Sequence, residues 1–206
     1  MTHYTEKKFN IPELKGISRK TVEEHLKLYA GYVKNVNLIY NKLAEYMEDS
    51  EKHALALAEL QRRFSFEWNG MRNHEFYFAA LEDGPQALSE GGALKAAIAA
   101  EFGSFENLLA TFKAIALMRG VGWAMLYFDK KAGGENGAGG KLVHAWVEEQ
   151  HIGQLNGAQL ILGLDMWEHS YYLDYTPAEK KKYIEAFFEN LNWSVVEENF
   201  ANASKN

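Results

Sequence analysis

The chain has 206 residues, 47% of them hydrophobic, and a formal net charge of −6. This composition predicts a globular protein with one large or two small domains, and it argues against binding to nucleic acid or to an anionic membrane surface. Cysteine is absent, so any metal must be held by histidine, acidic or backbone groups. Residues 1–10 are polar and no long apolar run exists, so we expect no signal peptide, no transmembrane helix and a cytoplasmic protein.

Two long helices are predicted for the first half of the chain. Residues 21–46 carry apolar side chains at helical spacing, follow the candidate capping residue Ser18 and contain no proline. A second helical region covers residues 51–81, with Asn69-Gly70 as a candidate break. The turn at 82–85 is the best domain boundary. We therefore expect a helical hairpin domain at 1–84 and a second domain at 85–206.

The second half is predicted to be mixed, which makes the whole chain α+β. Two or three short helices fit residues 87–119, and strands fit residues 123–128, 142–147 and 158–165. The glycine-rich segment 132–140 is expected to connect the first two strands as a hairpin. Helices at 177–188 and from Trp193 onward close the chain. The strands predict a small antiparallel sheet.

Asp165 and His169 are the leading candidates for metal ligands. The apolar run at 160–164 predicts a buried strand that ends at Asp165, and His169 follows four residues later. Oxygen and nitrogen donors together suit manganese, iron or zinc. The alternative is an aspartate that caps a turn and a histidine that belongs to the core.

Two further histidines lie on the predicted helices. His74 is surrounded by large aromatic residues, where a core histidine is more common than a ligand. His25, Tyr29 and Tyr32 share one face of the first helix, so Tyr32 is expected near whatever His25 binds. The alternative for this face is a boundary histidine followed by two core tyrosines.

A set of ordered motifs then indicates a family resemblance. Residues 165–175 have the pattern Asp-x-Trp-Glu-His-x-Tyr-Tyr-Leu-x-Tyr, which is a highly specific signature of the iron/manganese superoxide dismutases. Asn-His-x-Phe-Tyr at 73–77, Gly-Val-Gly-Trp at 120–123 and Asn-Trp at 192–193 recur in that family in the same order. The chain therefore resembles this family over nearly its whole length.

The resemblance implies a fold, a reaction and a set of ligands. The fold is a helical hairpin followed by an α/β domain with a three-stranded antiparallel sheet, with one metal ion between the two. The reaction converts superoxide to oxygen and hydrogen peroxide by redox cycling of manganese or iron. The implied ligands are His25, His74, Asp165 and His169.

The resemblance also implies two residues that act beside the metal. Tyr32 is the gateway phenol, and Gln150 hydrogen bonds to the solvent molecule on the metal, with His151 as its rival. The family usually has eight residues from the first ligand to the gateway tyrosine, whereas His25 to Tyr32 spans seven. We keep His25 as the ligand because it still shares a face with Tyr32, and Glu24 is the lesser option.

A homodimer is implied by the same resemblance. Glu168 of one subunit is expected to accept a hydrogen bond from His169 of the other, with Tyr172 at the same interface. In the first helix Tyr29 replaces a histidine that in the family meets the opposite subunit's tyrosine. Whether a contact between Tyr29 and Tyr172 takes over this relay is left open by the sequence.

The choice of metal and two other functions complete the expectations. Gly70, a loop glutamine and Gly163 resemble manganese members, so we expect one manganese or iron ion per chain, with manganese favoured. The alternatives are a catalytically silent metal-binding member of the fold and a zinc hydrolase. Redox-inert zinc would not need the aromatic cage that we expect around the site, which consists of Tyr32, Phe78, Trp123 and Trp167.

Overall fold

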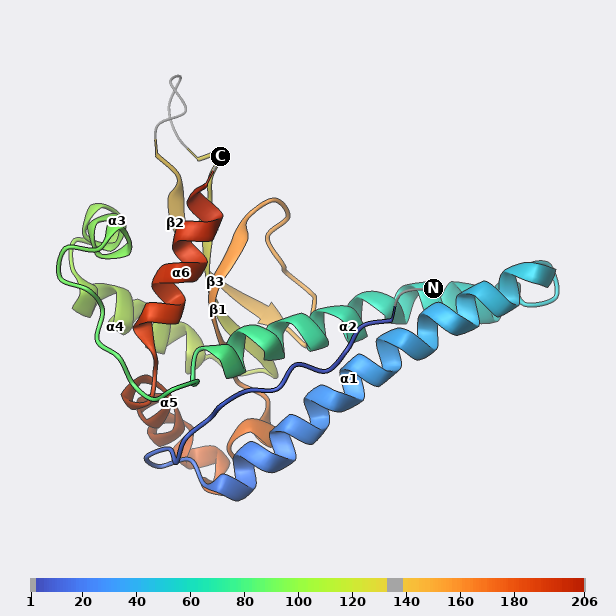
Figure 1. Ribbon diagram of the computed structural model, residues 1–206, viewed down its shortest axis with the longest axis horizontal. Helices are drawn as coiled ribbons and strands as arrows, with labels where there is room; N and C mark the ends of the chain where they lie inside the picture. Colours follow the sequence, from blue (N-terminus) through green and yellow to red (C-terminus); the bar gives the residue numbers. More distant parts are fainter. Residues whose placement is uncertain (1–2, 133–138, 206) are drawn as a thin grey trace.

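The computed structural model describes residues 3–132 and 139–205. Within them, two long helices form a hairpin that projects from an α/β part with four shorter helices and a three-stranded sheet (Figure 1). This arrangement confirms the expected fold class. The predicted hairpin connection at 132–140 falls mostly on 133–138, which lie outside the described residues. The domain division at residue 84 stays a prediction.

Helix α1 spans Arg19–Tyr46 and begins where the sequence indicated. The Ser18 side chain accepts a hydrogen bond from the Thr21 backbone N–H, which satisfies one of the free donors of the first turn. Its buried face includes His25, Tyr29 and Val33. His25 therefore lies on the face of α1 that packs inward.

Helix α2 spans Ala54–Ala79 without interruption, so the candidate break at Asn69-Gly70 is wrong. Glycine weakens a helix through its backbone entropy, but here tertiary packing outweighs that cost. A Cβ atom on Gly70 would lie 2.5 Å from Cδ1 of Tyr32 on α1. The glycine is thus the position at which the ring of Tyr32 fits against α2.

Substitution at Gly70 should therefore destabilise the protein. Gly70→Ala should lower the free energy of unfolding by about 1–3 kcal/mol, because overpacking forces the Tyr32 ring to move. The matched control is Gly31→Ala on α1, where nothing lies within 4 Å of the added Cβ. That change should be neutral or stabilising by up to about 1 kcal/mol, since alanine favours helix. Urea unfolding of both variants decides, and equal effects would contradict the packing argument.

The sheet has the order β2-β1-β3 with antiparallel neighbours. Strands β1 (Gly122–Asp129), β2 (Lys141–Glu148) and β3 (Gln159–Asp165) match the predicted strands to within a residue or two. The central strand β1 is buried almost throughout. Its register pairs Trp123 with Asp165, which brings an indole beside the end of β3.

Helices α3 (Ala93–Phe102), α4 (Phe105–Ala116), α5 (Lys180–Glu189) and α6 (Trp193–Ser204) complete the α/β part. Contacts join α4 to β1 and β2, and α6 to β3 and β1. The hairpin reaches the same sheet, because α2 contacts β3 and α1 contacts the short turn Glu168–Ser170. Both long helices therefore meet the end of β3.

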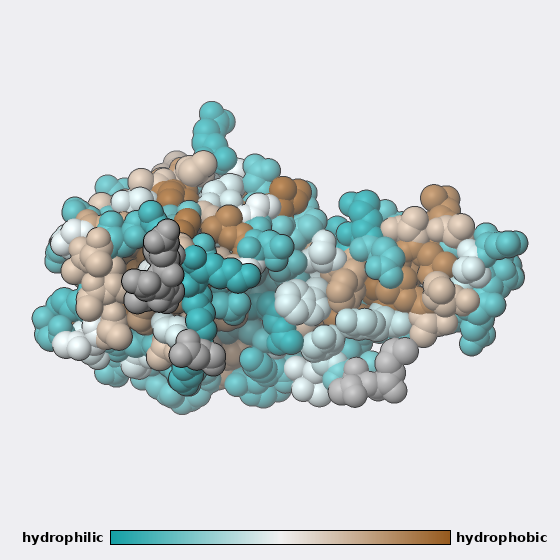
Figure 2. Space-filling model, turned by 90° about the horizontal axis from the view of Figure 1, so that it is seen from above, coloured by the Kyte–Doolittle hydropathy of each residue, from teal (hydrophilic) through white to brown (hydrophobic). Residues whose placement is uncertain are grey.

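The free end of the hairpin shows apolar side chains on its surface, on the right of Figure 2. Exposed large apolar residues in this region of the chain are Leu38, Met47 and Leu55. None of the helices in the described segments is long and apolar enough to cross a membrane.

Candidate metal centre

Four side chains converge where the hairpin meets the α/β part. His25 comes from α1, His74 from α2, Asp165 from the end of β3, and His169 from the turn that follows. One ligand atom from each residue lies within 4.8 Å of all the others. Among the residues that the structure describes, this is the one cluster of histidine and acidic groups with metal-ligand geometry.

Asp165 is the centre of this cluster. Its Oδ2 atom lies 3.1 Å from His25 Nε2, 3.2 Å from His169 Nε2 and 3.5 Å from His74 Nε2. Its other oxygen, Oδ1, accepts a hydrogen bond from the backbone N–H of Trp167 at 2.8 Å. The turn after β3 therefore holds the buried carboxylate with one oxygen facing three imidazole nitrogens.

The orientation of His74 leaves a nitrogen lone pair in the cluster. Its Nδ1 donates to the carbonyl oxygen of Gly70 at 2.6 Å, so the bare nitrogen is Nε2. Nε2 is buried and has no hydrogen-bond partner in the described part of the chain. Such a buried polar atom calls for an explanation, and a bound cation at this point would supply the missing partner. The residues present therefore fit a metal ion.

The protonation states of the clustered side chains also suit a bound metal ion. Burial lowers the pKa of His74 to about 3 and also lowers the pKa of His25. Burial alone would raise the pKa of Asp165, but His169 and His25 outweigh it and hold that pKa well below its usual range. At neutral pH His25 and His74 are thus neutral imidazoles and Asp165 is an ionised carboxylate, which are the forms that bind metal.

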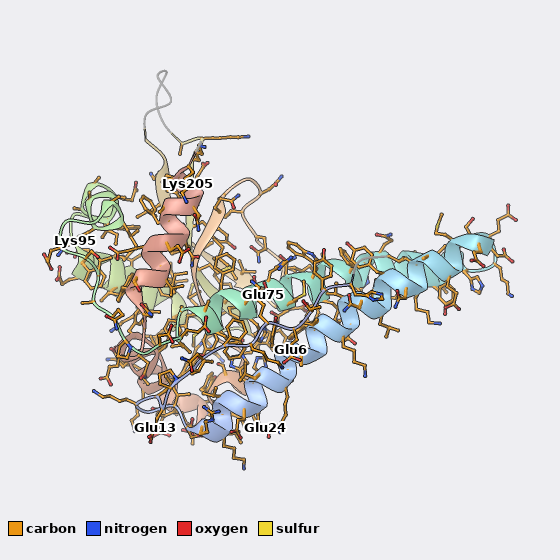
Figure 3. The ribbon with its side chains drawn as sticks, viewed as in Figure 1. Glu6, Glu13, Glu24, Glu75, Lys95 and Lys205 are labelled. Atoms are coloured by element: carbon orange, nitrogen blue, oxygen red, sulfur yellow. The ribbon has the colours of Figure 1, made fainter. Side chains whose placement is uncertain are left out.

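His25, not Glu24, faces the cluster. Helix α1 is regular through this region, and the His25 side chain is 2% exposed. The Glu24 carboxylate lies on the outer side of α1 (Figure 3) and forms an ion pair with Lys27 at 2.8 Å. The shorter spacing to Tyr32 therefore leaves both side chains on one inward face without any bulge.

Substitutions in α1 should separate these two residues. His25→Ala should abolish metal binding, because it removes a nitrogen donor that lies 3.1 Å from the Asp165 carboxylate. Glu24→Gln should leave metal content unchanged, because its ion pair with Lys27 is exposed and contributes little. Elemental analysis of both purified proteins provides the measurement. If Glu24→Gln lost its metal while His25→Ala retained it, Glu24 would be the ligand from α1.

Gln150 lies beside the cluster, where hydrogen bonds hold both its side chain and its backbone. Its side-chain oxygen accepts from Trp123 Nε1 at 2.9 Å, and its amide donates to the Tyr32 hydroxyl at 3.0 Å. Its backbone oxygen accepts from Asn73 Nδ2 at 2.9 Å. The rival residue His151 is half-buried and instead meets the ring of Phe66, with 5.8 Å between the ring centroids. The structure therefore brings Gln150 to Tyr32, while its role toward a metal-bound molecule stays a prediction.

Tyr32 lies on the partly exposed side of the cluster, which is called the opening below. Tyr32, Trp167 and His169 are half-buried, whereas His25, His74, Asp165 and Gln150 are buried. Burial raises the pKa of Tyr32 far above its ordinary value, so its hydroxyl keeps its proton. Because the phenol oxygen already accepts from Gln150, its own proton is free to be donated into the opening.

The hydrogen bonds of Tyr29 are not the contact with Tyr172 that the sequence left open. Its hydroxyl donates to Glu75 at 3.3 Å and accepts from the Lys7 backbone N–H at 2.9 Å. Glu75, labelled in Figure 3, also pairs with Lys7 at 3.1 Å and with Arg72 at 2.8 Å. Tyr29 is fully buried and Tyr172 is exposed. The hydroxyl of Tyr29 is therefore engaged inside its own chain, which does not favour a relay through Tyr172.

Two tyrosines behind the cluster were missed in the sequence. The Tyr183 hydroxyl, from α5, donates to the backbone oxygen of Asp165 at 2.9 Å and lies 3.2 Å from the Tyr77 hydroxyl. The ring of Tyr77 in turn packs on His25 at 4.9 Å between centroids. A buried tyrosine on an amphipathic helix looks like any core residue, so no signal in the sequence singled them out.

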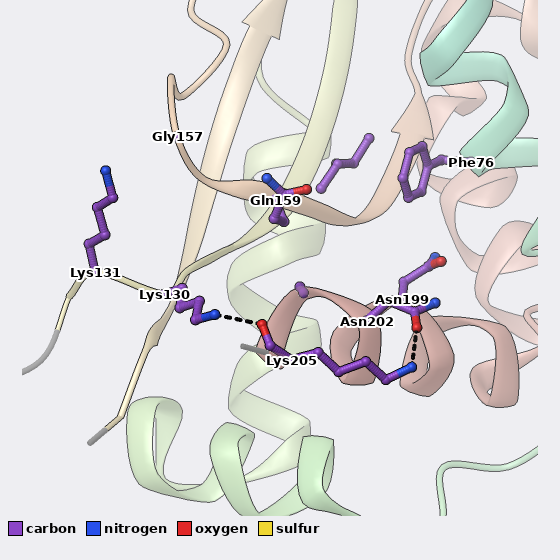
Figure 4. A pocket seen from close by; sticks show the side chains of 10 residues that line it. Phe76, Lys130, Lys131, Gly157, Gln159, Asn199, Asn202 and Lys205 are labelled. Atoms are coloured by element: carbon purple, nitrogen blue, oxygen red, sulfur yellow. Dashed lines mark hydrogen bonds between the residues drawn. The ribbon is translucent and has the colours of Figure 1, made fainter. Parts of the chain in front are cut away.

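A surface pocket of the α/β part lies away from the cluster. It has a volume of about 470 Å³ and lies between β1, β3 and α6, lined by residues such as Lys130, Gln159 and Asn202 (Figure 4). Lys130 donates to the Lys205 backbone oxygen at 2.5 Å, and Lys205 Nζ donates to Asn202 at 2.7 Å. The pocket contains none of the four clustered donors.

Comparison with known proteins places this fold and cluster in one family. The alpha-hairpin domain of the iron/manganese superoxide dismutases matches residues 12–82, and their C-terminal domain matches residues 90–199. The chain belongs to the iron/manganese superoxide dismutase family.

Individual relatives cover nearly the whole chain. It is 37% identical to a protein named superoxide dismutase [Fe] of Cupriavidus metallidurans, over 93% of this chain and 92% of that one. It is 33% identical to superoxide dismutase [Fe] of Aquifex pyrophilus, over 93% and 88%. It is 35% identical to superoxide dismutase [Mn] of Mycolicibacterium smegmatis, over 87% and 82%. Relatives named for either metal therefore match over most of their length.

Proposed function

We propose that this protein is a superoxide dismutase that works with one manganese or iron ion per chain. The observation that carries the proposal is the convergence of three imidazoles and one carboxylate at the place where the two matched domains meet. His25, His74, Asp165 and His169 would hold the ion.

The bound ion would supply a one-electron couple, by which one superoxide is oxidised to oxygen and a second is reduced, with two protons, to hydrogen peroxide. The residues of the chain set the conditions for that couple. A single carboxylate among three imidazoles leaves the site with a net positive charge when a di- or trivalent ion is present, which attracts an anion. Tyr32 offers a proton at the opening, and Gln150 fixes the phenol through the bond at 3.0 Å.

Two other functions fit the observations less well. A zinc hydrolase would share the donor set, but it does not account for membership of a family whose relatives are named for iron or manganese. A catalytically silent member of the fold does not account for the donor cluster, which is complete and buried. Neither alternative is favoured.

We propose manganese as the preferred metal. Support comes from Gly70, where Tyr32 leaves no room for a side chain from α2, and from Gln150, which reaches Tyr32 from the loop instead. Affinity alone does not select manganese, so the supply of metal also matters. The test is elemental analysis, then superoxide consumption by the metal-free protein after reconstitution with manganese, iron or zinc in turn. Activity with manganese or iron supports the function, whereas inactivity with both would refute it.

We further propose a homodimer through the turn that carries His169. Glu168 and Tyr172 are exposed, and the apolar side chains of Leu117, Met118 and Val121 are exposed as well. A carboxylate from the partner that accepts from the second nitrogen of His169 would fix that imidazole.

Glu168→Ala should therefore weaken both the dimer and the retention of metal. Loss of an outer hydrogen-bond partner typically costs about 10- to 100-fold in metal affinity. Sedimentation at micromolar concentration measures the assembly, and competition with a chelator measures retention. Glu179→Ala, a carboxylate that caps the turn before α5, serves as the control and should change neither. A wild-type monomer would count against the interface, while a tetramer would leave it standing.

A further inference from the structure

The charge of the chain raises a question about how its substrate arrives. Superoxide is an anion, whereas the chain carries a net charge of −6, so the overall charge does not attract it. Beyond the charge of the loaded metal site itself, attraction must come from positive groups close to the opening beside Tyr32, Trp167 and His169. This question, and the answer below, rest on the proposed function.

Phe66 of α2 packs near two residues of that opening and stacks against the cation of Arg63. Its ring centroid is 6.1 Å from that of Tyr32 and 6.4 Å from that of Trp167. The guanidinium carbon of Arg63, one helical turn earlier, lies 3.7 Å from the Phe66 centroid. Arginine favours such stacking on aromatic faces. The positive charge of Arg63 is thereby held at the rim of the opening.

A buried carboxylate fixes the direction of this charge. Arg63 Nε donates to Glu67 Oε1 at 2.9 Å, and Asn35 donates to the other Glu67 oxygen at 3.2 Å. The Glu67 side chain is 6% exposed and that of Arg63 is 44% exposed, so the positive end of the pair faces solvent. The two terminal amino groups of Arg63 have no acceptor among the described residues. Their N–H groups remain available to a passing anion.

The neighbouring Arg62 lacks these properties and provides a matched control. Its Nε and one terminal nitrogen both donate to Glu59, each at 2.7 Å, so its guanidinium is tied to an exposed carboxylate in a bidentate pair. Its side chain is 70% exposed.

We propose that Arg63 is a guiding residue that draws the anionic substrate to the opening at Tyr32, with Phe66 and Glu67 holding its guanidinium in place. Superoxide would meet the free N–H groups of Arg63 first and the phenol of Tyr32 next. Arg63 takes no part in bond making or electron transfer. Arg63 raises the rate at which the anion associates with the site, and this effect should weaken as salt screens the charge.

The test measures arrival with two anions on the metal-loaded protein. Azide association is followed by stopped-flow absorbance, and superoxide decay by pulse radiolysis, each from low to high ionic strength. Arg63→Gln should slow both processes about two- to fivefold at low salt and flatten their salt dependence. Arg63→Lys should restore most of the rate because it keeps the charge. Arg62→Gln should leave both rates close to wild type.

Glu67→Gln provides a second variant in case Arg63→Gln, which leaves a buried carboxylate unpaired, fails to fold. It removes the negative end of the pair, so azide association should become faster, and an unchanged rate would overturn the proposal. Equal slowing by Arg62→Gln and Arg63→Gln would also overturn it, since any surface charge would then suffice. The two proposals can also fail separately. If azide binds more slowly to Arg63→Gln than to wild type, but the wild-type protein does not consume superoxide, the proposed function is refuted and the guidance of anions stands.

Discussion

Asp165→Ala should yield a folded protein without iron or manganese and without superoxide consumption after reconstitution. Asp165 supplies the only carboxylate of the described cluster, and its Oδ2 lies within 3.5 Å of all three imidazoles. Loss of an outer partner of a ligand costs about 10- to 100-fold in metal affinity, so loss of the ligand itself should cost more. Metal content by elemental analysis and activity should fall together.

Two controls separate this effect from damage to the fold. Asp165→Asn keeps an oxygen that can accept from the Trp167 backbone N–H but removes the charge, so it should fold normally and still bind metal poorly. Asp129→Ala, at the end of strand β1, should lose neither metal nor activity. Full metal content in Asp165→Ala would show that the ligand assignment is wrong.

Gln150→Ala should keep its metal and lose most of its turnover. Gln150 contacts Trp123 and Tyr32 but is not one of the four clustered donors. Its loss leaves the Trp123 N–H and the Tyr32 phenol without their shared partner, and it frees Tyr32 to move at the opening. We expect turnover to fall about 10- to 100-fold, as is typical for residues that support a metal site from outside the ligand set.

The rival substitution His151→Ala tests the same assignment from the other side. His151 packs against Phe66 and makes no hydrogen bond to Tyr32. Its loss should therefore change turnover little. If His151→Ala lost most of its turnover while Gln150→Ala kept it, the hydrogen bond to the metal-bound solvent would belong to the His151 imidazole. That result would also weaken the preference for manganese. Metal content must be measured in both proteins, because a loss of metal from Gln150→Ala would contradict the expectation that this variant loses turnover alone.

The positions that local sequence predicted well are those where one pattern has one structural outcome. The alternation of short apolar runs and turns predicted strands β1, β2 and β3, and the end of β3 delivers Asp165 as expected. The cap at Ser18 predicted the start of α1 for a similarly local reason. By contrast, the candidate break at Gly70 is wrong, because the low helix propensity of glycine is a local property while the Tyr32 ring that Gly70 accommodates comes from another helix.

Where two adjacent residues could each fill a role at the site, contacts with distant segments decide between them. Gln150 and His151 follow one another in a loop, and only the hydrogen bonds from Trp123 and to Tyr32 distinguish them. The bonds of Tyr29 to Glu75 and Lys7 join positions 46 and 22 residues apart. No periodicity within one helix predicts contacts of this kind.

The sequence by itself determined the fold class, the family resemblance and, through that resemblance, His74, Asp165 and His169 as expected metal ligands. Hydrophobic periodicity indicates the helices and strands, and a specific motif with fixed spacing indicates the family. Only the tertiary structure decided that His25 rather than Glu24 faces Asp165, that Gln150 reaches Tyr32, and that Arg63 lies over Phe66 at the opening. The physical reason is that a rotation of about 100° along a helix, or one step along a loop, changes which side chain points inward. Packing against distant segments selects among these positions.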